Sequence, residues 1–210
     1  MDELAPDSTE TRGLLEQAGA GATKAFDRLI DRHRPALRRF VALRLGPELG
    51  ARVDASDIVQ ETQLEAFRRL EDYLERRPMP FGLWLRKTAY ERLLMLRRRH
   101  LAAGRRTVGR EVALPARSSL SLARQLLAST STPSERLVRQ ELVRRVQQAV
   151  AQLADSDREI LLMRNFEESS YQDIACLLGI DPAAARKRHG RALARLARRL
   201  ASTGFGESQL

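Results

Sequence analysis

One stretch of the chain, SYQDIACLLGIDP at residues 170–182, constrains the fold most, because two helix starts flank a single turn signal. Ser170 can cap a first helix, and Asp181 followed by proline can begin a second. Gly179 supplies the sharp turn, and the small side chain of Ala175 lets the two helices cross closely. The pattern predicts a helix-turn-helix.

The second of these helices is rich in arginine, and its outward face combines alanine with basic side chains. In a helix-turn-helix, the early outward residues of the second helix reach base edges in the major groove of DNA. Arginine and lysine there can pair with guanine or hold phosphates. The candidate DNA-binding residues of this helix are Ala183, Ala184, Arg186, Lys187 and Arg191. An ordinary helical hairpin with a solvated basic face is the alternative, and the coincidence of caps, glycine and basic face favours DNA binding.

Apolar residues recur at spacings of three and four along most of the chain, and no segment shows convincing strand alternation. A helix is expected near residues 26–41, where Pro35 should kink or split it, and a loop should follow over 46–52. The next helix begins at a cap formed by Asp54. Residues 71–80 are expected to form a loop, because Pro78 and Pro80 forbid regular pairing, and a further helix is expected over 81–101.

The helical periodicity fades over residues 102–133, where glycine, proline, serine and threonine are frequent, and it resumes near residue 134. The predicted fold class is therefore all-α, with two small helical domains joined by a flexible linker. The predicted boundaries are a flexible N-terminal segment over 1–22, a first domain over 23–101, the linker over 102–133, a helix-turn-helix domain over 134–202 and a tail over 203–210.

The helix that follows Asp54 carries an acidic and polar stripe opposite its apolar face. The stripe consists of Asp57, Gln60, Glu61 and Leu64, which fall at i, i+3, i+4 and i+7 and so share one face. Such a face suits a partner helix that bears arginines, and a solvated surface is the alternative. These four residues are the candidate protein-binding site.

The helix over residues 81–101 mixes aromatic and basic residues, a combination that can stack on unpaired bases while holding their backbone. Phe81, Trp84 and Tyr90 are its aromatic residues. Trp84 is expected in the core or at its edge, because a lone tryptophan at helical spacing is usually a core residue. The candidate DNA-binding residues of this helix are Arg86, Lys87, Arg97, Arg98 and Arg99.

The net charge of +10 and the pI near 10.9 favour an anionic partner such as DNA. No apolar run is long enough to span a bilayer, the acidic start lacks a signal-peptide pattern, and Cys176 is the only cysteine. We therefore expect a cytoplasmic chain without membrane insertion. No catalytic residue, metal site or cofactor is predicted, because His33, His100 and His189 are scattered and no phosphate-binding glycine loop occurs.

Taken together, these segments resemble the bacterial RNA polymerase sigma factors of the extracytoplasmic-function group, in their minimal two-domain form. The resemblance covers about residues 23–200. It rests on DIVQET at 57–62, on Phe81 with Trp84-Leu85, and on YQDIA with the following LGI at 171–180. It implies a first domain, region 2, that binds the beta-prime clamp helices of core RNA polymerase and opens the minus-ten element of promoter DNA. A second domain, region 4, would bind the minus-thirty-five element and the beta flap.

By this resemblance, Asp57, Gln60 and Glu61 contact the clamp, and the loop from Tyr73 to Pro80 holds a flipped base of the non-template strand. The basic residues of helix 81–101 would hold the phosphates of that strand, and those of the last helix would read the upstream element. The family uses no catalytic residues of its own, and an anti-sigma factor is a further plausible partner. The alternative function is a stand-alone helix-turn-helix transcriptional regulator that acts without core polymerase.

The chain departs from the family pattern at several positions. The family usually has Asn and Asp where this chain has Glu91 and Met95, and Gly-Leu where it has Glu168-Ser169. Within the second helix of the helix-turn-helix, His189 stands where a leucine is usual, and Ala185 stands in place of a valine. Such differences are typical of a divergent subgroup with its own promoter sequence or of a weakly active member.

Overall fold

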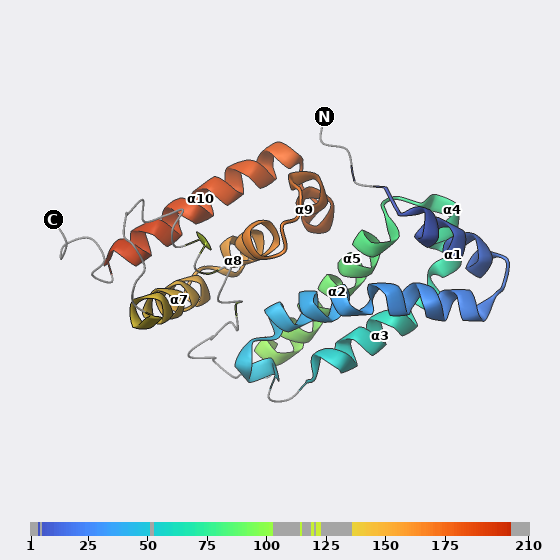
Figure 1. The fold of residues 1–210 in the computed structure, drawn as a ribbon, viewed down its shortest axis with the longest axis horizontal. Coiled ribbons are helices and arrows are strands. Elements are labelled where there is room, and N and C mark those ends of the chain that lie inside the picture. Colours follow the sequence, from blue (N-terminus) through green and yellow to red (C-terminus); the bar gives the residue numbers. More distant parts are fainter. Residues whose placement is uncertain are drawn as a thin grey trace. The chain divides into compact units, whose positions relative to one another are not determined.

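The computed structural model describes residues 4, 6–50, 53–102, 114, 119, 121–122 and 136–202, and these form helices and short connections with no strand among them. The chain divides into two compact units, Met1–Thr107 and Val108–Leu210, here called the N-terminal unit and the C-terminal unit. Figure 1 follows their helices in chain order. The prediction of an all-α fold is confirmed.

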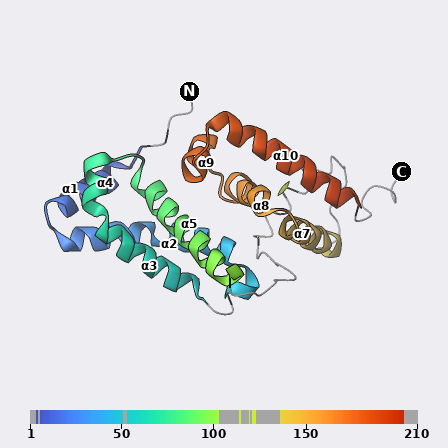
Figure 2. The ribbon, with the colours of Figure 1, turned by 180° about the vertical axis from the view of Figure 1, so that it is seen from behind.

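The N-terminal unit consists of α1 (Thr9–Gly19), α2 (Thr23–Gly50), α3 (Ala55–Arg68), α4 (Leu70–Arg76) and α5 (Phe81–Ala102). The long helices α2, α3 and α5 pack on one another. The short helices α1 and α4 lie side by side at the end of the unit where α2 begins (Figures 1 and 2). Buried apolar side chains from all five helices form one core.

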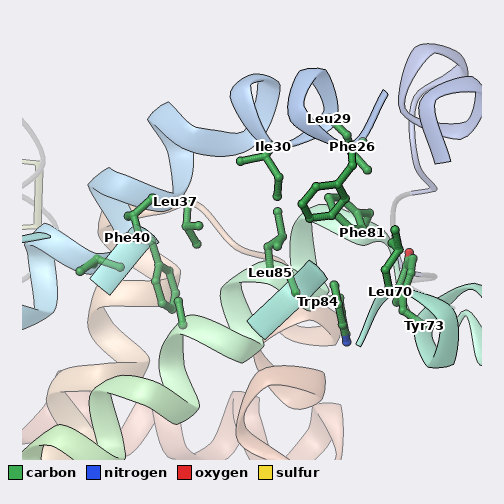
Figure 3. Close-up of a cluster of buried hydrophobic side chains, with 14 of the residues drawn as sticks. Phe26, Leu29, Ile30, Leu37, Phe40, Leu70, Tyr73, Phe81, Trp84 and Leu85 are labelled. Atoms are coloured by element: carbon green, nitrogen blue, oxygen red, sulfur yellow. The ribbon is translucent and has the colours of Figure 1, made fainter. Parts of the chain in front are cut away.

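An aromatic cluster of Tyr73, Phe81 and Trp84 joins α4 to α5 in this core (Figure 3). The fully buried ring of Phe81 has its centroid 5.4 Å from that of Tyr73 and 5.6 Å from that of Trp84. The His33 ring of α2 meets Phe81 edge-on, with the centroids 5.5 Å apart. Trp84 is only 6% exposed, so it is a core residue as predicted. Neither Phe81 nor Trp84 is therefore available as a surface on which unpaired bases could stack.

The N-terminal segment contains a helix that the sequence did not reveal. Residues 9–19 form α1, whose Leu14 and Leu15 are buried where the helix packs on α2, so the prediction of a flexible segment over 1–22 is wrong for this part. Two adjacent leucines in a polar stretch are too short a pattern to give a helical periodicity.

The connection from α4 to α5 is held from two sides. The Tyr73 hydroxyl donates to the main-chain carbonyl of Met79 at 3.0 Å. The Asp7 carboxylate accepts the Phe81 N–H with both oxygens, at 2.9 and 3.0 Å, and thereby caps α5. Arg77 ends α4 in the left-handed conformation, with φ 36°. Residues 77–80 are thus a short and well-anchored connection.

Three further expectations about the N-terminal unit are wrong. α2 runs through Pro35 without a break, because one proline removes a single hydrogen bond while Leu37, Phe40 and Val41 continue the buried face. The same helix extends to Gly50, so the loop predicted over 46–52 is helical up to that residue. Residues 70–76 form α4 instead of a loop, because the prolines at 78 and 80 stop a helix without preventing one before them.

The C-terminal unit contains α7 (Arg136–Ala151), α8 (Asp155–Leu161), the π-helix η1 (Leu162–Phe166), α9 (Tyr171–Leu178) and α10 (Pro182–Leu200). The long helix α10 packs on α7, α8 and α9. Its inward face buries Ala185, His189, Ala192, Leu196 and Leu200.

Most of the linker predicted over 102–133, and the tail predicted over 203–210, lie outside the described residues. Within the linker range, Leu114, Ser119 and Leu122 are buried. The side-chain amide of Gln147 in α7 donates to the Leu114 carbonyl at 2.7 Å. These described positions of the linker range are therefore packed residues.

Candidate protein- and nucleic-acid-binding surfaces

The predicted helix-turn-helix is formed by α9 and α10. Ser170 and Asp173 make a capping box: the Ser170 hydroxyl accepts the Asp173 N–H at 3.0 Å, and the Asp173 carboxylate accepts the Ser170 N–H at 3.3 Å. Gly179 ends α9 with φ 65°, a conformation that glycine adopts without steric cost. The Asp181 carboxylate accepts the Ala184 N–H at 2.7 Å and caps α10. The two helix caps and the glycine turn that the sequence predicts are therefore all present in the structure.

The outward face of α10 carries the candidate DNA-binding residues together. Ala183, Arg186, Lys187 and Arg191 are exposed, and Ala184 is half-buried. The Arg186 guanidinium carbon lies 5.1 Å from the centroid of the Tyr171 ring, within the range of a cation–π contact. The early turns of α10 thus present methyl groups and cations side by side, the two kinds of group that contact thymine methyls and guanine or phosphate oxygens.

Arg195, further along α10, has an internal role that the residue pattern did not indicate. Its Nη1 lies 2.6 Å from Oδ2 of Asp157, a buried residue of α8. This ion pair compensates the charge of a carboxylate that is 3% exposed, so it belongs to the packing of α8 on α10. A pairing across 38 positions of sequence leaves no local signal.

The acidic stripe lies on the exposed face of α3. Its members, Asp57, Gln60, Glu61 and Leu64, are all exposed, and Leu64 is 55% exposed. The Asp57 carboxylate also accepts the Asp54 N–H at 3.4 Å in the capping box of α3. Glu61 forms an ion pair with Arg92 of α5, with 3.1 Å between Oε2 and Nη1. Both carboxylates of the stripe therefore have partners within the unit while they face solvent.

The candidate DNA-binding residues of α5 fall into two groups. Arg98 and Arg99 are exposed, whereas Arg86 and Lys87 are half-buried. Arg97 is half-buried and donates from Nη2 to the main-chain carbonyl of Arg44 at 3.0 Å, which ties α5 to α2. A main-chain acceptor cannot be read from residue types, so sequence reasoning missed this contact.

Two departures from the family pattern lie just before α9. Glu168 adopts φ 56°, the left-handed region that disfavours residues with a Cβ atom, at the position where the family has glycine. Ser169 is 4% exposed, and its hydroxyl has no hydrogen-bond partner in the structure, at the position where the family has leucine. Both positions therefore carry a residue that suits its site less well than the family residue would.

We expect Glu168→Gly to raise the free energy of unfolding of the C-terminal unit by about 1 kcal/mol, because it removes left-handed strain at a modest cost in chain entropy. Urea unfolding followed by the NMR resonances of α9 and α10 measures the change. Glu167→Gly is the matched control, since Glu167 has φ −108° and gains nothing from glycine. Equal effects of the two substitutions would contradict the strain at Glu168.

A buried histidine of α10 packs between the two helices of the motif. His189 is 7% exposed; its Nδ1 lies 2.9 Å from the Tyr171 hydroxyl and its Nε2 lies 2.9 Å from Oδ1 of Asn165. Burial lowers the pKa of His189 below its ordinary value of 6.5, and the nearby charge of Arg164 lowers this pKa further. The imidazole is therefore neutral at physiological pH.

The lowered pKa predicts that the C-terminal unit loses stability as the pH falls below about 6.5. Histidine in the unfolded chain takes up a proton near that pH, whereas folded His189 resists protonation until a lower pH, so acid favours unfolding. The urea midpoint of this unit, followed by NMR at several pH values, measures the loss. In His189→Leu the loss of stability below about pH 6.5 should disappear. If the loss persists in this variant, another titratable group causes it.

Within the described part of the chain, no group of three or more His, Cys, Asp or Glu side chains is arranged to hold a metal ion. No helix among the same residues is both long and apolar enough to cross a bilayer.

Comparison with protein families gives one match in each unit. Residues 29–102 match the family described as sigma-70 region 2, and residues 143–196 match sigma-70, region 4. The first match contains α3 with its acidic stripe and α5, and the second contains α9 and most of α10.

Several curated proteins are similar over most of their length. The RNA polymerase sigma factor CnrH of Cupriavidus metallidurans is 28% identical over 189 residues, which are 88% of this chain and 91% of CnrH. The ECF RNA polymerase sigma-E factor of Haemophilus influenzae is 26% identical, over 86% of this chain and 90% of that protein. The ECF RNA polymerase sigma factor SigD of Mycobacterium tuberculosis is 25% identical, over 91% of this chain and 84% of SigD.

Two solved structures share the fold. CnrH in complex with the cytosolic domain of CnrY matches with a TM-score of 0.59 and 25% identity, covering 92% of this chain and 99% of CnrH. The sigma factor RpoE of Bartonella quintana, in complex with the anti-sigma factor NepR, matches with a TM-score of 0.56 and 19% identity over 85% of this chain and 98% of RpoE. The family matches and the relatives described here give no support to a stand-alone transcriptional regulator.

Proposed function

Since this chain belongs to the sigma-70 family, as a divergent member of its extracytoplasmic-function group, we propose that it binds core polymerase through α3 and reads promoter DNA through α5 and α10. A sigma factor directs promoter-specific initiation and leaves the chemistry of RNA synthesis to the polymerase. The observation that carries the residue assignment is the exposure of two faces of opposite charge, the acidic stripe in the region 2 match and the basic face of α10 in the region 4 match.

The proposed polymerase-binding surface is the acidic stripe on α3. Its carboxylates and amide are exposed beside Leu64, an apolar side chain that is 55% exposed. Arginine-bearing helices, such as the beta-prime clamp helices that we propose as the partner, can form charge-assisted hydrogen bonds with such a face while covering the leucine. The ion pair between Glu61 and Arg92 holds Glu61 on the surface of α3 before the partner arrives.

The proposed minus-ten surface combines the connection at residues 77–80 with the basic residues of α5. The contacts of Asp7 and Tyr73 fix this connection, which suits it to hold one flipped base of the non-template strand. Arg86, Lys87 and Arg97 to Arg99 supply the cations for the phosphates of that strand. Since the aromatic cluster is buried, we assign the backbone contacts to these cations and no stacking role to Trp84.

The proposed minus-thirty-five surface is the outward face of α10. Arg186, Lys187 and Arg191 would contact guanines or phosphates, and the methyl groups of Ala183 and Ala184 would contact thymine. The C-terminal unit would also dock on the beta flap of the polymerase. Two modest DNA contacts, linked through one holoenzyme, act at a high effective concentration, so promoter binding by the complex exceeds that by the free chain.

CnrH has been solved in complex with the cytosolic domain of CnrY. By its similarity to CnrH, we propose that this chain also binds a protein partner, and we infer that this partner is an anti-sigma factor. This chain would act in the cytoplasm, where promoter DNA and polymerase are found.

The test is a binding and run-off transcription assay with the full chain, bacterial core polymerase and genomic promoter fragments. We expect a stable complex with core polymerase and transcripts that start at discrete promoters only when the chain is present. Tight, sequence-specific DNA binding by the chain alone, without affinity for core polymerase, would contradict the proposal.

A further inference from the structure

A polar chain of three side chains, with the buried His189 between the half-buried Asn165 and Tyr171, links the helix-turn-helix to η1. Asn165 Oδ1 can only accept a hydrogen bond, so His189 carries its proton on Nε2 and donates to Asn165 at 2.9 Å. Nδ1 of His189 is then unprotonated and accepts the Tyr171 hydroxyl proton at 2.9 Å. One imidazole thus satisfies partners on two different elements, with Asn165 in η1 and Tyr171 at the start of α9.

Directional contacts of this kind fix the Tyr171 side chain in a way that an apolar side chain cannot. The leucine that is usual at position 189 could fill the same space, but it offers no acceptor to the Tyr171 hydroxyl. The ring of Tyr171 could then turn about its side-chain bonds, because within the described part of the chain no second hydrogen bond holds the hydroxyl. His189 therefore determines where the Tyr171 ring lies as well as filling the joint.

The Tyr171 ring in turn contacts two guanidinium groups. The Arg164 guanidinium carbon lies 4.9 Å from the ring centroid, and that of Arg186 lies 5.1 Å from it. Arg164 is anchored separately, since its Nη1 donates to the Ser169 carbonyl at 2.9 Å. Arg186 is an exposed residue in the early turns of α10, so the ring selects one of the many directions in which its long side chain could extend.

We propose that His189 is a positioning residue for promoter recognition: it holds the Tyr171 ring, and the ring holds the Arg186 guanidinium in the orientation that contacts DNA. This inference rests on the proposed role of Arg186 in reading the upstream element. His189 touches no DNA in this arrangement and acts only through Tyr171. The histidine that replaces the usual leucine thus determines the orientation of an exposed recognition residue, Arg186, although His189 itself is buried.

The first arm of the test compares holoenzymes made with His189→Leu, Tyr171→Phe and Arg186→Ala, binding a promoter fragment that is active in the run-off assay. Tyr171→Phe keeps the ring and removes only the hydroxyl, so it isolates the hydrogen bond. We expect each of the first two variants to lower affinity by about three- to tenfold, as for loss of one hydrogen-bonded orientation. In the Arg186→Ala background, either change should have no further effect, whereas in an Arg191→Ala background the effects should multiply.

The second arm needs no DNA. In the full chain, the side-chain protons of Arg186 should show a ring-current shift from Tyr171 in NMR spectra, and this shift should decrease in both His189→Leu and Tyr171→Phe. Unchanged Arg186 shifts in the two variants, or affinity losses that multiply fully with Arg186→Ala, would overturn the positioning role. If Arg186→Ala binds promoter DNA as tightly as the unaltered chain, the proposed DNA contact of Arg186 is wrong. The positioning role of His189 in recognition is then overturned as well, even if the ring-current shifts change as expected.

Discussion

Replacing Phe81 by alanine is expected to lower the free energy of unfolding of the N-terminal unit by about 3–5 kcal/mol, the usual range for a buried phenylalanine. The Phe81 side chain is fully buried, and its ring contacts Tyr73, Trp84 and His33 from three helices. The resulting cavity would lie between α2, α4 and α5, where the rigid helices cannot collapse to fill it. Trp84 is the only tryptophan of the chain, so urea unfolding followed by its fluorescence reports this unit alone.

Phe67→Ala is the matched control for this substitution. Phe67 lies on α3 of the same unit but is 55% exposed, so its removal should cost much less, about 1 kcal/mol or below. Similar losses in the two variants would show that Phe81 does not occupy the centre of the core. The resonances of α9 and α10 should be unaffected by either change.

Reversing the charge of the acidic stripe is expected to abolish most of the affinity for core polymerase. In Asp57→Arg combined with Glu61→Arg, two exposed carboxylates become cations that would face the arginines of the proposed clamp helices. Like charges across an interface cost several kcal/mol, so we expect a loss of about 100-fold or more. Fluorescence anisotropy of the labelled chain titrated with core polymerase measures it, and run-off transcription should fall in parallel.

The control is Asp27→Arg combined with Asp31→Arg on α2. These two residues are exposed and have the same i, i+4 spacing, so the net charge changes equally at another face of the same unit. Glu61→Arg also breaks the ion pair with Arg92, and Trp84 fluorescence in urea establishes whether the variant remains folded. Equal loss of core binding in both double variants would indicate a general charge effect and refute the α3 surface.

The parts of the fold that could be predicted are those whose causes lie close together in sequence. The caps at Ser170 and Asp181 and the turn at Gly179 depend on contacts within a few residues, and all of them form. The stripe on α3 follows from helical spacing, and the expectation that Trp84 lies in the core is confirmed. Local chemistry and periodicity were sufficient in these cases.

The parts that could not be predicted depend on partners distant in sequence. Arg195 is exposed and pairs with the buried Asp157, and the half-buried Arg97 donates to a main-chain carbonyl of α2, so residue type alone does not reveal the structural contact that either cation makes. Pro35 does not break α2, because burial of neighbouring side chains outweighs one lost hydrogen bond, and the prolines at 78 and 80 lie beyond the end of α4 and do not prevent that helix. The π-helix η1 and the left-handed Glu168 have no recognisable sequence signal. The assignment of site residues to polymerase and to DNA remains a prediction.

The contact of Asp7 with the Phe81 N–H bears on how this protein is made. Seventy-four positions separate the two residues, so the carboxylate leaves the ribosome long before its partner is synthesised. Until α5 emerges, α1, α2, α3 and α4 can pack on one another, but the faces of α2 and α3 that pack on α5 have nothing to cover them. The helical core of the N-terminal unit is therefore completed only when α5 has emerged and the Asp7 carboxylate can accept the Phe81 N–H. Ribosome-bound chains should accordingly expose to chaperones the apolar faces of α2 and α3 that pack on α5, until α5 is complete.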